Sequence, residues 1–306
     1  MNLPKRVRIR EVGPRDGFQS WPDIIPTGLK LEVIHAAMDA GLKEIEAASF
    51  VNPKAIPQMK DASELVAEIR TSETVICGMT PNFKGAQNAI AAGVDEIHLF
   101  VSASEAHNLA NVRRTIDESL AGFASVFQLA AEKDIPVLGA VAVSFGCPYE
   151  GEVSPDQVVR ITEAYLEQGA RAIVLADTTG MATPLQVKKL IAILRAKFPV
   201  ADFGLHFHNN RGTAMVNLYA ALESGITLFD TALGGIGGCP NVPLAAGNLA
   251  TEDVVYLLDE MGIETGIDLE VLIHAARKLE RILGKTLPGQ VMKSGSRLAG
   301  ISCDHG

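Results

Sequence analysis

Two histidines, His206 and His208, stand two residues apart at the end of an apolar run of the sequence. Residues at positions i and i+2 of a β-strand point to the same face, so their imidazoles are expected to point the same way. Far upstream, Arg15 and Asp16 follow a short segment with β-branched residues that is expected to form a strand, and they precede a glycine. A carboxylate delivered from a distant strand end completes a cation site with two imidazoles. The pattern therefore indicates a divalent metal in an enzyme active site.

Elements that position such residues are visible along the chain. Short runs rich in Val, Ile and Leu alternate with longer segments whose apolar residues recur at helical spacing. Pro155 and Pro184 mark helix starts, and several helices end at glycine. The expected strands are Val7–Glu11, Glu44–Ala48, Thr74–Gly78, Glu96–Val101, Val137–Ser144, Ala172–Asp177, Phe203–His208 and Leu228–Leu233. The expected helices include Leu29–Ala40, Ser63–Arg70, Thr115–Glu132, Pro155–Gln168, Pro184–Phe198, Thr213–Ser224 and Asp268–Leu283.

Repeated strand–helix units with strands that are apolar throughout favour an α/β fold, a closed (β/α)₈ or TIM barrel, over an open doubly wound sheet. An open sheet that binds dinucleotides would carry Gly-x-Gly-x-x-Gly after its first strand. The turn here is Gly13-Pro14-Arg15-Asp16-Gly17. We expect residues 1–306 to form a single barrel domain, with residues 265–306 as a C-terminal helical cap or lid.

The composition limits the partners of the protein. The chain has 306 residues, is 47% hydrophobic and carries a formal net charge of -9, which argues against a nucleic acid or an anionic membrane as partner. No apolar stretch reaches the roughly 20 residues of a membrane span, and the N-terminus does not resemble a signal peptide. Four cysteines without a C-x-x-C pair do not suggest a disulfide framework. We expect a cytoplasmic protein that forms a homo-oligomer, a dimer or higher.

In barrels of this kind the chemistry sits at the carboxyl ends of the strands. Glu46 lies on the second expected strand, and the eighth runs into a glycine-rich segment that contains Cys239 and precedes Asn248. Together with the arginine–aspartate pair and the histidines, these residues come from four strands that are far apart in the sequence. They are expected to converge at one end of the barrel.

Four segments of the chain resemble 3-hydroxy-3-methylglutaryl-CoA lyases, a family within the metal-dependent lyase and Claisen-synthase barrel superfamily. The segments are Glu11–Gln19, Ile45–Val51, Phe145–Gly151 and Gly237–Pro240, and the resemblance covers roughly residues 7–300. It implies an oxo-acid lyase that uses Mg²⁺ or Mn²⁺ to cleave an acyl-CoA thioester, 3-hydroxy-3-methylglutaryl-CoA, into acetyl-CoA and acetoacetate.

The resemblance also implies roles for individual residues. Positions that match the family's metal ligands are Asp16, His206, His208 and Asn248. Positions that match its catalytic groups are Arg15, Glu46 and Cys239, and His206 is expected to share in catalysis. Expected substrate-binding residues are Gln19, Ser49, Asn111 and Arg211.

The chemistry of these residue types agrees with the implied reaction. A metal would acidify the substrate 3-hydroxyl, as metals lower the pKa of bound water from 15.7 to about 7. Loss of that proton expels the acetyl-CoA enolate, whose oxygen Arg15 would stabilise. Cys239 would protonate the enolate carbon from a loop whose glycines allow closure. For Glu46 three roles stay open: proton transfer, holding a water, or only an ion pair with Arg15.

Three segments depart from the family pattern, at residues 103–108, 209–211 and 241–246. The metal-binding and catalytic positions are retained, whereas the segments expected to face the substrate differ. An altered pocket favours a related substrate as the alternative, such as citramalyl-CoA, which would give acetyl-CoA and pyruvate. The methylglutaryl substrate stays ahead because of the family resemblance.

Other protein classes are disfavoured by particular residues. A Claisen synthase typically carries Gly-Glu-Arg after the eighth strand and a long C-terminal regulatory domain, whereas this chain has Gly-Gly-Cys and a short tail. A biotin-dependent carboxyltransferase needs a catalytic lysine on a strand, and the expected strands hold no obvious one. A non-catalytic binding protein on this scaffold should have lost one of Arg15, Asp16, His206 or His208, and all four are present. The predicted function is therefore a carbon–carbon lyase.

Overall fold

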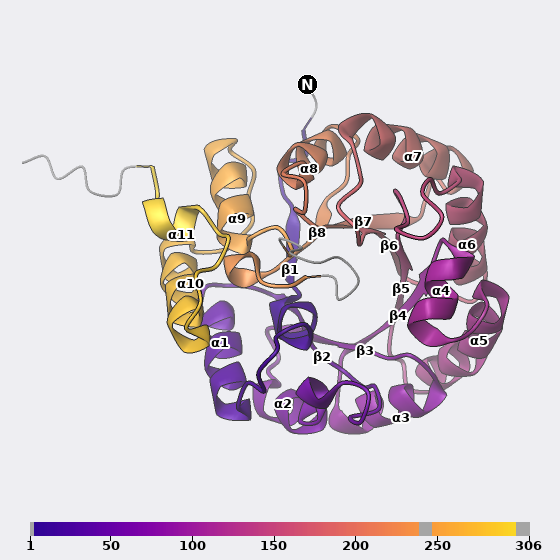
Figure 1. Ribbon diagram of the computed structural model, residues 1–306, viewed down its shortest axis with the longest axis horizontal. Helices are drawn as coiled ribbons and strands as arrows, with labels where there is room; N and C mark the ends of the chain where they lie inside the picture. The colour runs from indigo at the N-terminus through magenta and orange to yellow at the C-terminus, as the bar shows by residue number, and fades with distance from the viewer. Residues whose placement is uncertain (1–2, 239–246, 298–306) are drawn as a thin grey trace, which may run out of the picture.

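The computed structural model describes residues 3–238 and 247–297. Eight parallel strands close into a barrel in sequence order, with the last strand paired to the first. Figure 1 looks along the barrel, so that the strands form an inner ring surrounded by helices. The strands are β1 (Arg8–Glu11), β2 (Glu44–Ser49), β3 (Val75–Met79), β4 (Glu96–Ser102), β5 (Val137–Ala142), β6 (Ala172–Asp177), β7 (Asp202–Phe207) and β8 (Leu228–Thr231). The expected TIM barrel is confirmed.

At least one helix follows each strand before the next begins. The helices are α1 (Thr27–Asp39), α2 (Ala62–Ile69), α3 (Phe83–Ala92), α4 (Glu105–Val112), α5 (Ile116–Glu132), α6 (Pro155–Glu167), α7 (Pro184–Lys197), α8 (Ala214–Glu223), α9 (Thr251–Glu260), α10 (Leu269–Leu283) and α11 (Val291–Ser294). Short helical turns are η1 (Gly13–Gly17), η2 (Pro57–Met59) and η3 (Leu233–Gly235). The C-terminal helices are present as expected, and α10 packs against α1 and α9 beside the barrel (Figure 1).

Most strands are rich in apolar residues because both of their faces are covered, although β1 and β2 also carry charged residues. All six residues of β6 are buried, between the barrel interior and the helix layer. On β5, Gly139 lies under the ring of Tyr165 from α6, and a Cβ there would come within 2.6 Å of that ring. Glycine therefore lets α6 pack closely on the sheet.

Two strands end two residues earlier than the apolar pattern predicts, and β7 ends one residue earlier, at Phe207. β5 ends at Ala142 rather than Ser144, because Val143 adopts a left-handed φ of 53°. β8 ends at Thr231 rather than Leu233, because Gly234, with a φ of 66°, turns the chain into η3. Val143 and Leu233 nevertheless stay buried. The chain stays buried past each strand end. Because an apolar pattern in the sequence indicates burial and not backbone pairing, it places the strand ends too late.

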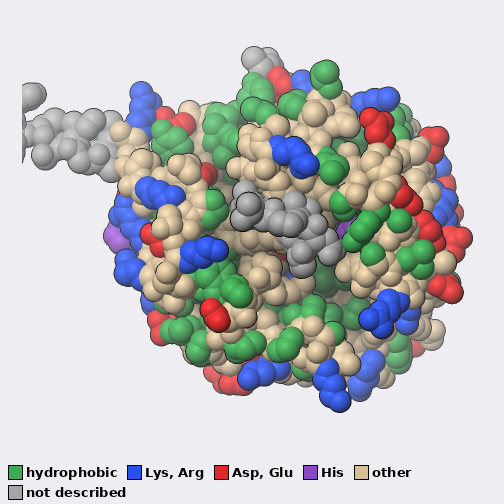
Figure 2. All heavy atoms as spheres, viewed as in Figure 1, with side chains coloured by type: hydrophobic (Ala, Val, Ile, Leu, Met, Phe, Trp, Pro, Cys, Tyr) green, Lys and Arg blue, Asp and Glu red, His purple; other side chains and the backbone are tan. Residues whose placement is uncertain are grey.

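Four helices lie outside the expected ranges: α3, α4, α9 and the four-residue α11, which falls within the expected C-terminal cap. The first contains Gly85 and the second has only eight residues, half of them polar, so neither offers a long series of apolar residues at helical spacing. In the described part of the chain no helix is both long and apolar enough to cross a membrane. Basic and acidic side chains are interspersed around the rim of the face shown in Figure 2, unlike the one-sign surfaces that bind nucleic acids.

Candidate active site at the carboxyl end of the barrel

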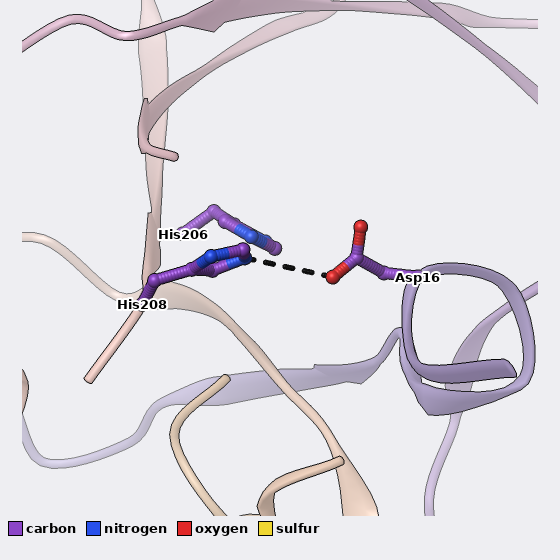
Figure 3. Close-up of side chains that lie close together, drawn as sticks. All are labelled: Asp16, His206 and His208. Carbon is purple, nitrogen blue, oxygen red and sulfur yellow. Dashed lines mark ion pairs between the residues drawn. The ribbon is translucent and has the colours of Figure 1, made fainter. Parts of the chain in front are cut away.

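The barrel brings the four predicted metal ligands together. His206 lies on β7, while His208 follows that strand and forms an isolated bridge with Asn248. Asp16 lies on η1, directly after β1. In Figure 3 its carboxylate points toward the two imidazole rings. Ligand atoms of the aspartate and both histidines lie within 4.8 Å of one another, which is close enough for one ion to contact all three.

Asn248 completes this group. Its Nδ2 donates a hydrogen bond of 2.8 Å to Oδ2 of Asp16, which also lies 3.5 Å from Nε2 of His208. The amide oxygen of Asn248 is buried and has no hydrogen-bond partner among the described residues. A buried oxygen without a donor calls for an explanation, and a cation supplies one. The residues present therefore fit a divalent metal.

A glycine keeps space open beside these ligands. Gly237 has a φ of 129°, which other residues rarely adopt. A Cβ at this position would lie 2.5 Å from Nδ2 of Asn248 and 3.4 Å from Oδ2 of Asp16. Any larger residue would therefore push against the ligand cluster.

The charge state of Asp16 is set by its neighbours. Burial alone would raise the pKa of this carboxyl, but the Arg15 guanidinium, followed by the two histidines, lowers it far below its usual range. Nη1 of Arg15 donates a hydrogen bond of 2.8 Å to Oδ1 of Asp16. Asp16 is thus ionised at any physiological pH and available as an anionic ligand.

Arg15 is held on its other side by Glu46. The Nε of the buried guanidinium donates to Oε2 of Glu46, a residue of β2. Burial works to raise the pKa of Glu46, but Arg15 and then His98 lower it. The arginine is fixed between two carboxylates, with its orientation determined before any ligand arrives.

His206 has a partner that the sequence pattern did not single out. Its Nδ1 lies 3.4 Å from Oδ2 of Asp230 on β8. Burial works to lower the pKa of His206, whereas Asp230, followed by Asp16, raises it. A carboxylate behind a ligating histidine fixes the orientation of its ring and increases its basicity.

The expected substrate-binding residues are more scattered. Ser49 ends β2 and is buried, and Gln19 follows η1 at intermediate depth. Asn111 is exposed on α4. Nη1 of the exposed Arg211 donates to the carbonyls of Thr179 and Gly180, at 2.8 and 3.1 Å. Substrate binding by these four residues stays a prediction. Cys239 and the altered segment 241–246 lie outside the described residues.

Sequence reasoning missed three charged or titratable residues inside the barrel. Arg10 on β1, His98 on β4 and Asp230 on β8 are all buried, and each contacts a residue of the site or a neighbour of one. A signal for His98 and Asp230 existed, because each stands among apolar residues of its strand, whereas Arg10 lies in a strand of mostly charged residues. An ionisable residue is almost never fully buried unless it is paired.

The donor set suits a hard or borderline ion: one carboxylate, two imidazoles and an amide oxygen.

The sequence model of the HMGL-like family matches residues 6–279. The chain belongs to the HMGL-like family. The expectation drawn from the four sequence segments is confirmed.

Known members of the HMGL-like family are similar to this chain over nearly its whole length. The chain is 43% identical to a hydroxymethylglutaryl-CoA lyase of Bacillus subtilis, over 96% of this chain and 100% of the relative. It is 38% identical to the human mitochondrial hydroxymethylglutaryl-CoA lyase, over 98% and 91% of the two chains. A solved structure of an HMG-CoA lyase from Acinetobacter baumannii, in complex with coenzyme A and 3-methylmalate, superimposes with a TM-score of 0.93 at 43% identity, and the match covers 98% of both chains.

Proposed function

We propose that the protein is a lyase that cleaves 3-hydroxy-3-methylglutaryl-CoA into acetyl-CoA and acetoacetate. The observation that carries the proposal is the convergence of a carboxylate, two histidines and an amide with Arg15 at one end of the barrel of an HMGL-like family member. The ligands bound to the Acinetobacter relative support it, since coenzyme A and a hydroxy dicarboxylate together match the parts of such a substrate.

Mg²⁺ or Mn²⁺ would be held by Asp16, His206, His208 and Asn248. When bound, the metal would lower the pKa of the substrate 3-hydroxyl so that it can be lost near neutral pH. Asp230 keeps the His206 ring oriented for this role. The choice of these two metals is supported by the oxygen and nitrogen donor set.

Arg15 would stabilise the charge that develops as the carbon–carbon bond breaks. The electron pair of that bond moves onto the thioester fragment and places negative charge on its oxygen. A guanidinium held in place by Glu46 and Asp16 needs little reorganisation to meet this charge. The enolate carbon then takes a proton, for which Cys239 is the proposed donor.

Contacts in the structure favour one of the three roles left open for Glu46. Its Oε2 accepts from Arg15 and its Oε1 lies 2.7 Å from Nδ1 of His98. Both oxygens are therefore engaged by the protein, and their engagement lowers the pKa of the carboxyl against the effect of burial. This arrangement suits a residue that positions Arg15 better than one that exchanges protons with substrate.

One experiment tests the reaction. The purified protein with Mg²⁺ is incubated separately with 3-hydroxy-3-methylglutaryl-CoA and with citramalyl-CoA, and the released keto acid is identified. We expect acetoacetate from the first, with kcat/KM above about 10⁴ M⁻¹s⁻¹, the lower end for an enzyme on its own substrate. Efficient release of pyruvate from citramalyl-CoA alone would transfer the proposal to that thioester. Irreversible condensation of acetyl-CoA with a keto acid would instead establish a synthase.

We further propose a cytoplasmic homodimer. Two observations support it: Cys77 and Cys147 are buried free thiols, and Leu185 on α7 and Val216 on the adjacent α8 are 80% and 53% exposed. Light scattering coupled to gel filtration tests the assembly. A monomer at micromolar concentration would contradict it.

A further inference from the structure

The barrel interior beneath the candidate site contains a chain of buried charged and polar groups. Nε of Arg10 donates a hydrogen bond of 2.9 Å to Oδ1 of Asp230, and its Nη1 lies 2.9 Å from Nε2 of His98. Nδ1 of the same histidine lies 2.7 Å from Oε1 of Glu46. These four residues are at most 8% exposed. We call Glu46, His98, Arg10 and Asp230 the interior link.

The interior link spans the barrel rather than following neighbouring strands. Arg10 stands on β1 opposite Asp230 of the adjacent β8, and its guanidinium reaches His98 on β4. Since β4 is not a neighbour of β1 in the ring, the side chain crosses the interior. An apolar filling would be the ordinary solution there, because burying charges costs more than burying hydrocarbon of the same volume.

Both ends of the interior link contact the site. Asp230 lies against Nδ1 of His206, a proposed metal ligand, and Glu46 accepts from Nε of Arg15. The path continues from Arg15 to Asp16 and on to His208, so an unbroken series of contacts leads through the interior from one proposed histidine ligand to the other. Two groups that must keep a fixed orientation are thus connected through Arg10 and His98.

The role of His98 toward Glu46 is the same in both of its protonation states. Ionised Glu46 can only accept, so Nδ1 of His98 carries the shared hydrogen. In the neutral ring Nε2 accepts from Arg10, and in the charged ring it donates to Glu96 Oε1, 2.9 Å away. Every form therefore delivers one donor to Glu46.

A competing assignment is a second metal site, because Cys77, Glu96 and His98 also offer ligand atoms within 4.8 Å of one another. The guanidinium of Arg10 argues against it. Its Nη1 lies 3.6 Å from Oε1 of Glu96 and 2.9 Å from the histidine, where a metal would have to sit. The cluster already holds a permanent cation, which would repel another.

We propose that Arg10 and His98 are positioning residues for the lyase reaction: His98 fixes Arg15 through Glu46, and Arg10 fixes His206 through Asp230. This inference rests on the proposed function for its kinetic part, whereas its metal-binding part can be tested without any turnover. Loss of His98 should lower kcat, and loss of Arg10 should lower the affinity for the metal. A general loss of stability would instead affect both properties in both variants.

The first arm of the test uses His98. Replacing it by leucine removes the donor to Glu46, and we expect kcat on 3-hydroxy-3-methylglutaryl-CoA to fall about 10- to 100-fold, as for other residues that orient catalytic groups. KM and the affinity for Mn²⁺, measured by titration calorimetry, should stay near those of the unchanged protein. His98→Asn, which restores an N–H near the position of Nδ1, should recover most of the loss. A fall in KM and kcat alike, or no recovery by asparagine, would overturn the role.

The second arm asks whether His98 acts through Glu46. We compare His98→Leu, Glu46→Gln and the double variant. If the histidine works only by holding the glutamate, the double variant should be no slower than Glu46→Gln alone. If the rate losses of the two single variants multiply in the double variant, His98 and Glu46 act independently, and the proposed connection between them would be overturned.

The third arm uses Arg10 and needs no substrate. Arg10→Met should weaken Mn²⁺ binding about tenfold, because Asp230 loses the donor that fixes it behind His206. Arg10→Lys keeps the charge and should fold even where the methionine variant does not, with an intermediate loss. Unchanged Mn²⁺ affinity in a folded Arg10 variant would overturn this half of the proposal. Failure of the unchanged protein to cleave the thioester would count against the proposed function and leave this arm intact.

The matched control is Val174→Ala. Val174 on β6 is buried in a small apolar cluster of the barrel with Leu138 and Leu228, a cluster that contains no residue of the interior link. This variant should lower the melting temperature without changing kcat or Mn²⁺ affinity. A kinetic loss as large as that of His98→Leu would mean that any disturbance of the interior slows the enzyme, and would overturn the proposal.

Discussion

Asp16 illustrates how one side chain in this protein serves several partners. One oxygen accepts from Arg15, and the other accepts from Asn248 and faces His208. Its negative charge is therefore needed both by the arginine and by the proposed metal. The short side chain projects from η1, whose tight turn places arginine and aspartate on the same side.

Asp16→Asn should weaken metal binding and turnover severely, because the amide supplies no charge and repels a neighbouring donor. Titration with Mn²⁺ and steady-state kinetics measure the two effects. The variant should still fold, because Glu46 remains a partner of Arg15, but the melting temperature of the metal-free protein should fall, since the buried guanidinium loses one of its two carboxylates. The exposed Asp23→Asn in the following loop is the matched control and should behave like the unchanged protein. Full turnover of Asp16→Asn would contradict the assignment.

Arg15→Gln should lower kcat about 10²- to 10³-fold and change KM much less, because the lost charge stabilises the transition state more than the ground state. Steady-state kinetics at saturating Mg²⁺ provide the measurement. If KM rises while kcat is kept, the arginine binds substrate and does not stabilise the enolate.

At this scale the sequence was informative where residue types are chemically specific. Two histidines at strand spacing, and an arginine–aspartate pair after a strand, point to a metal site without any structure. Asp230 and His98 could not be assigned in the same way. A lone buried acid or histidine can be paired anywhere in a core, and only the closed barrel shows which partner it meets.

Among the elements, the segment after β8 depends on two buried carboxyl groups. Glu11 on β1 accepts from the backbone N–H of Leu233, and Glu252 on α9 accepts from that of Gly234. Burial raises the pKa of Glu11 to about 7 and that of Glu252 to about 8, despite these hydrogen bonds. η3 is therefore anchored by acids that are easily neutralised.

Glu252 should make stability depend on pH. Its pKa is about 8 in the folded protein and near 4.5 when exposed, so between these values the folded state binds more protons and stability falls as pH rises. Melting temperatures from pH 5 to 9 measure this. Glu252→Gln should match the unchanged protein at pH 5 and exceed it at pH 9. The exposed Glu260→Gln on the same helix is the control, and a parallel profile for both variants would contradict the prediction.

Element boundaries were predicted less well than element types. All eight strands were anticipated, yet β5 stops early before the left-handed Val143, and β8 stops early before the turn η3, which contains the left-handed Gly234. Helix α4 has only eight residues, and its capping residue is Ser104, whose side chain accepts from the backbone N–H of His107. Local backbone conformation and short capped helices leave little trace in hydrophobic periodicity.

At the scale of the whole molecule, the proposed metal lies where the barrel closes, at the junction of the first strand with the last. The ligands follow β1, lie on β7 and follow β8, so one ion connects the first strand to the last two. Binding to the folded state alone should therefore stabilise the entire closed barrel.

Mn²⁺ at 100 times its dissociation constant should stabilise the protein by about 2.7 kcal/mol. Thermal unfolding monitored by circular dichroism should show a melting temperature that rises with metal concentration. His208→Ala is the control, since it lacks one ligand and should show a much smaller rise. An equal rise in both proteins would place the metal elsewhere.

The pairing of β1 with β8 also has a consequence for how the protein is made. During synthesis the arginine–aspartate turn leaves the ribosome first, and Asn248 follows only when most of the chain has been translated. Until β8 is available, β1 is an unpaired sheet edge that other chains can join. A nascent or truncated chain that ends before residue 228 would hold an aspartate and both histidines without a site, and we expect it to require chaperones or to aggregate.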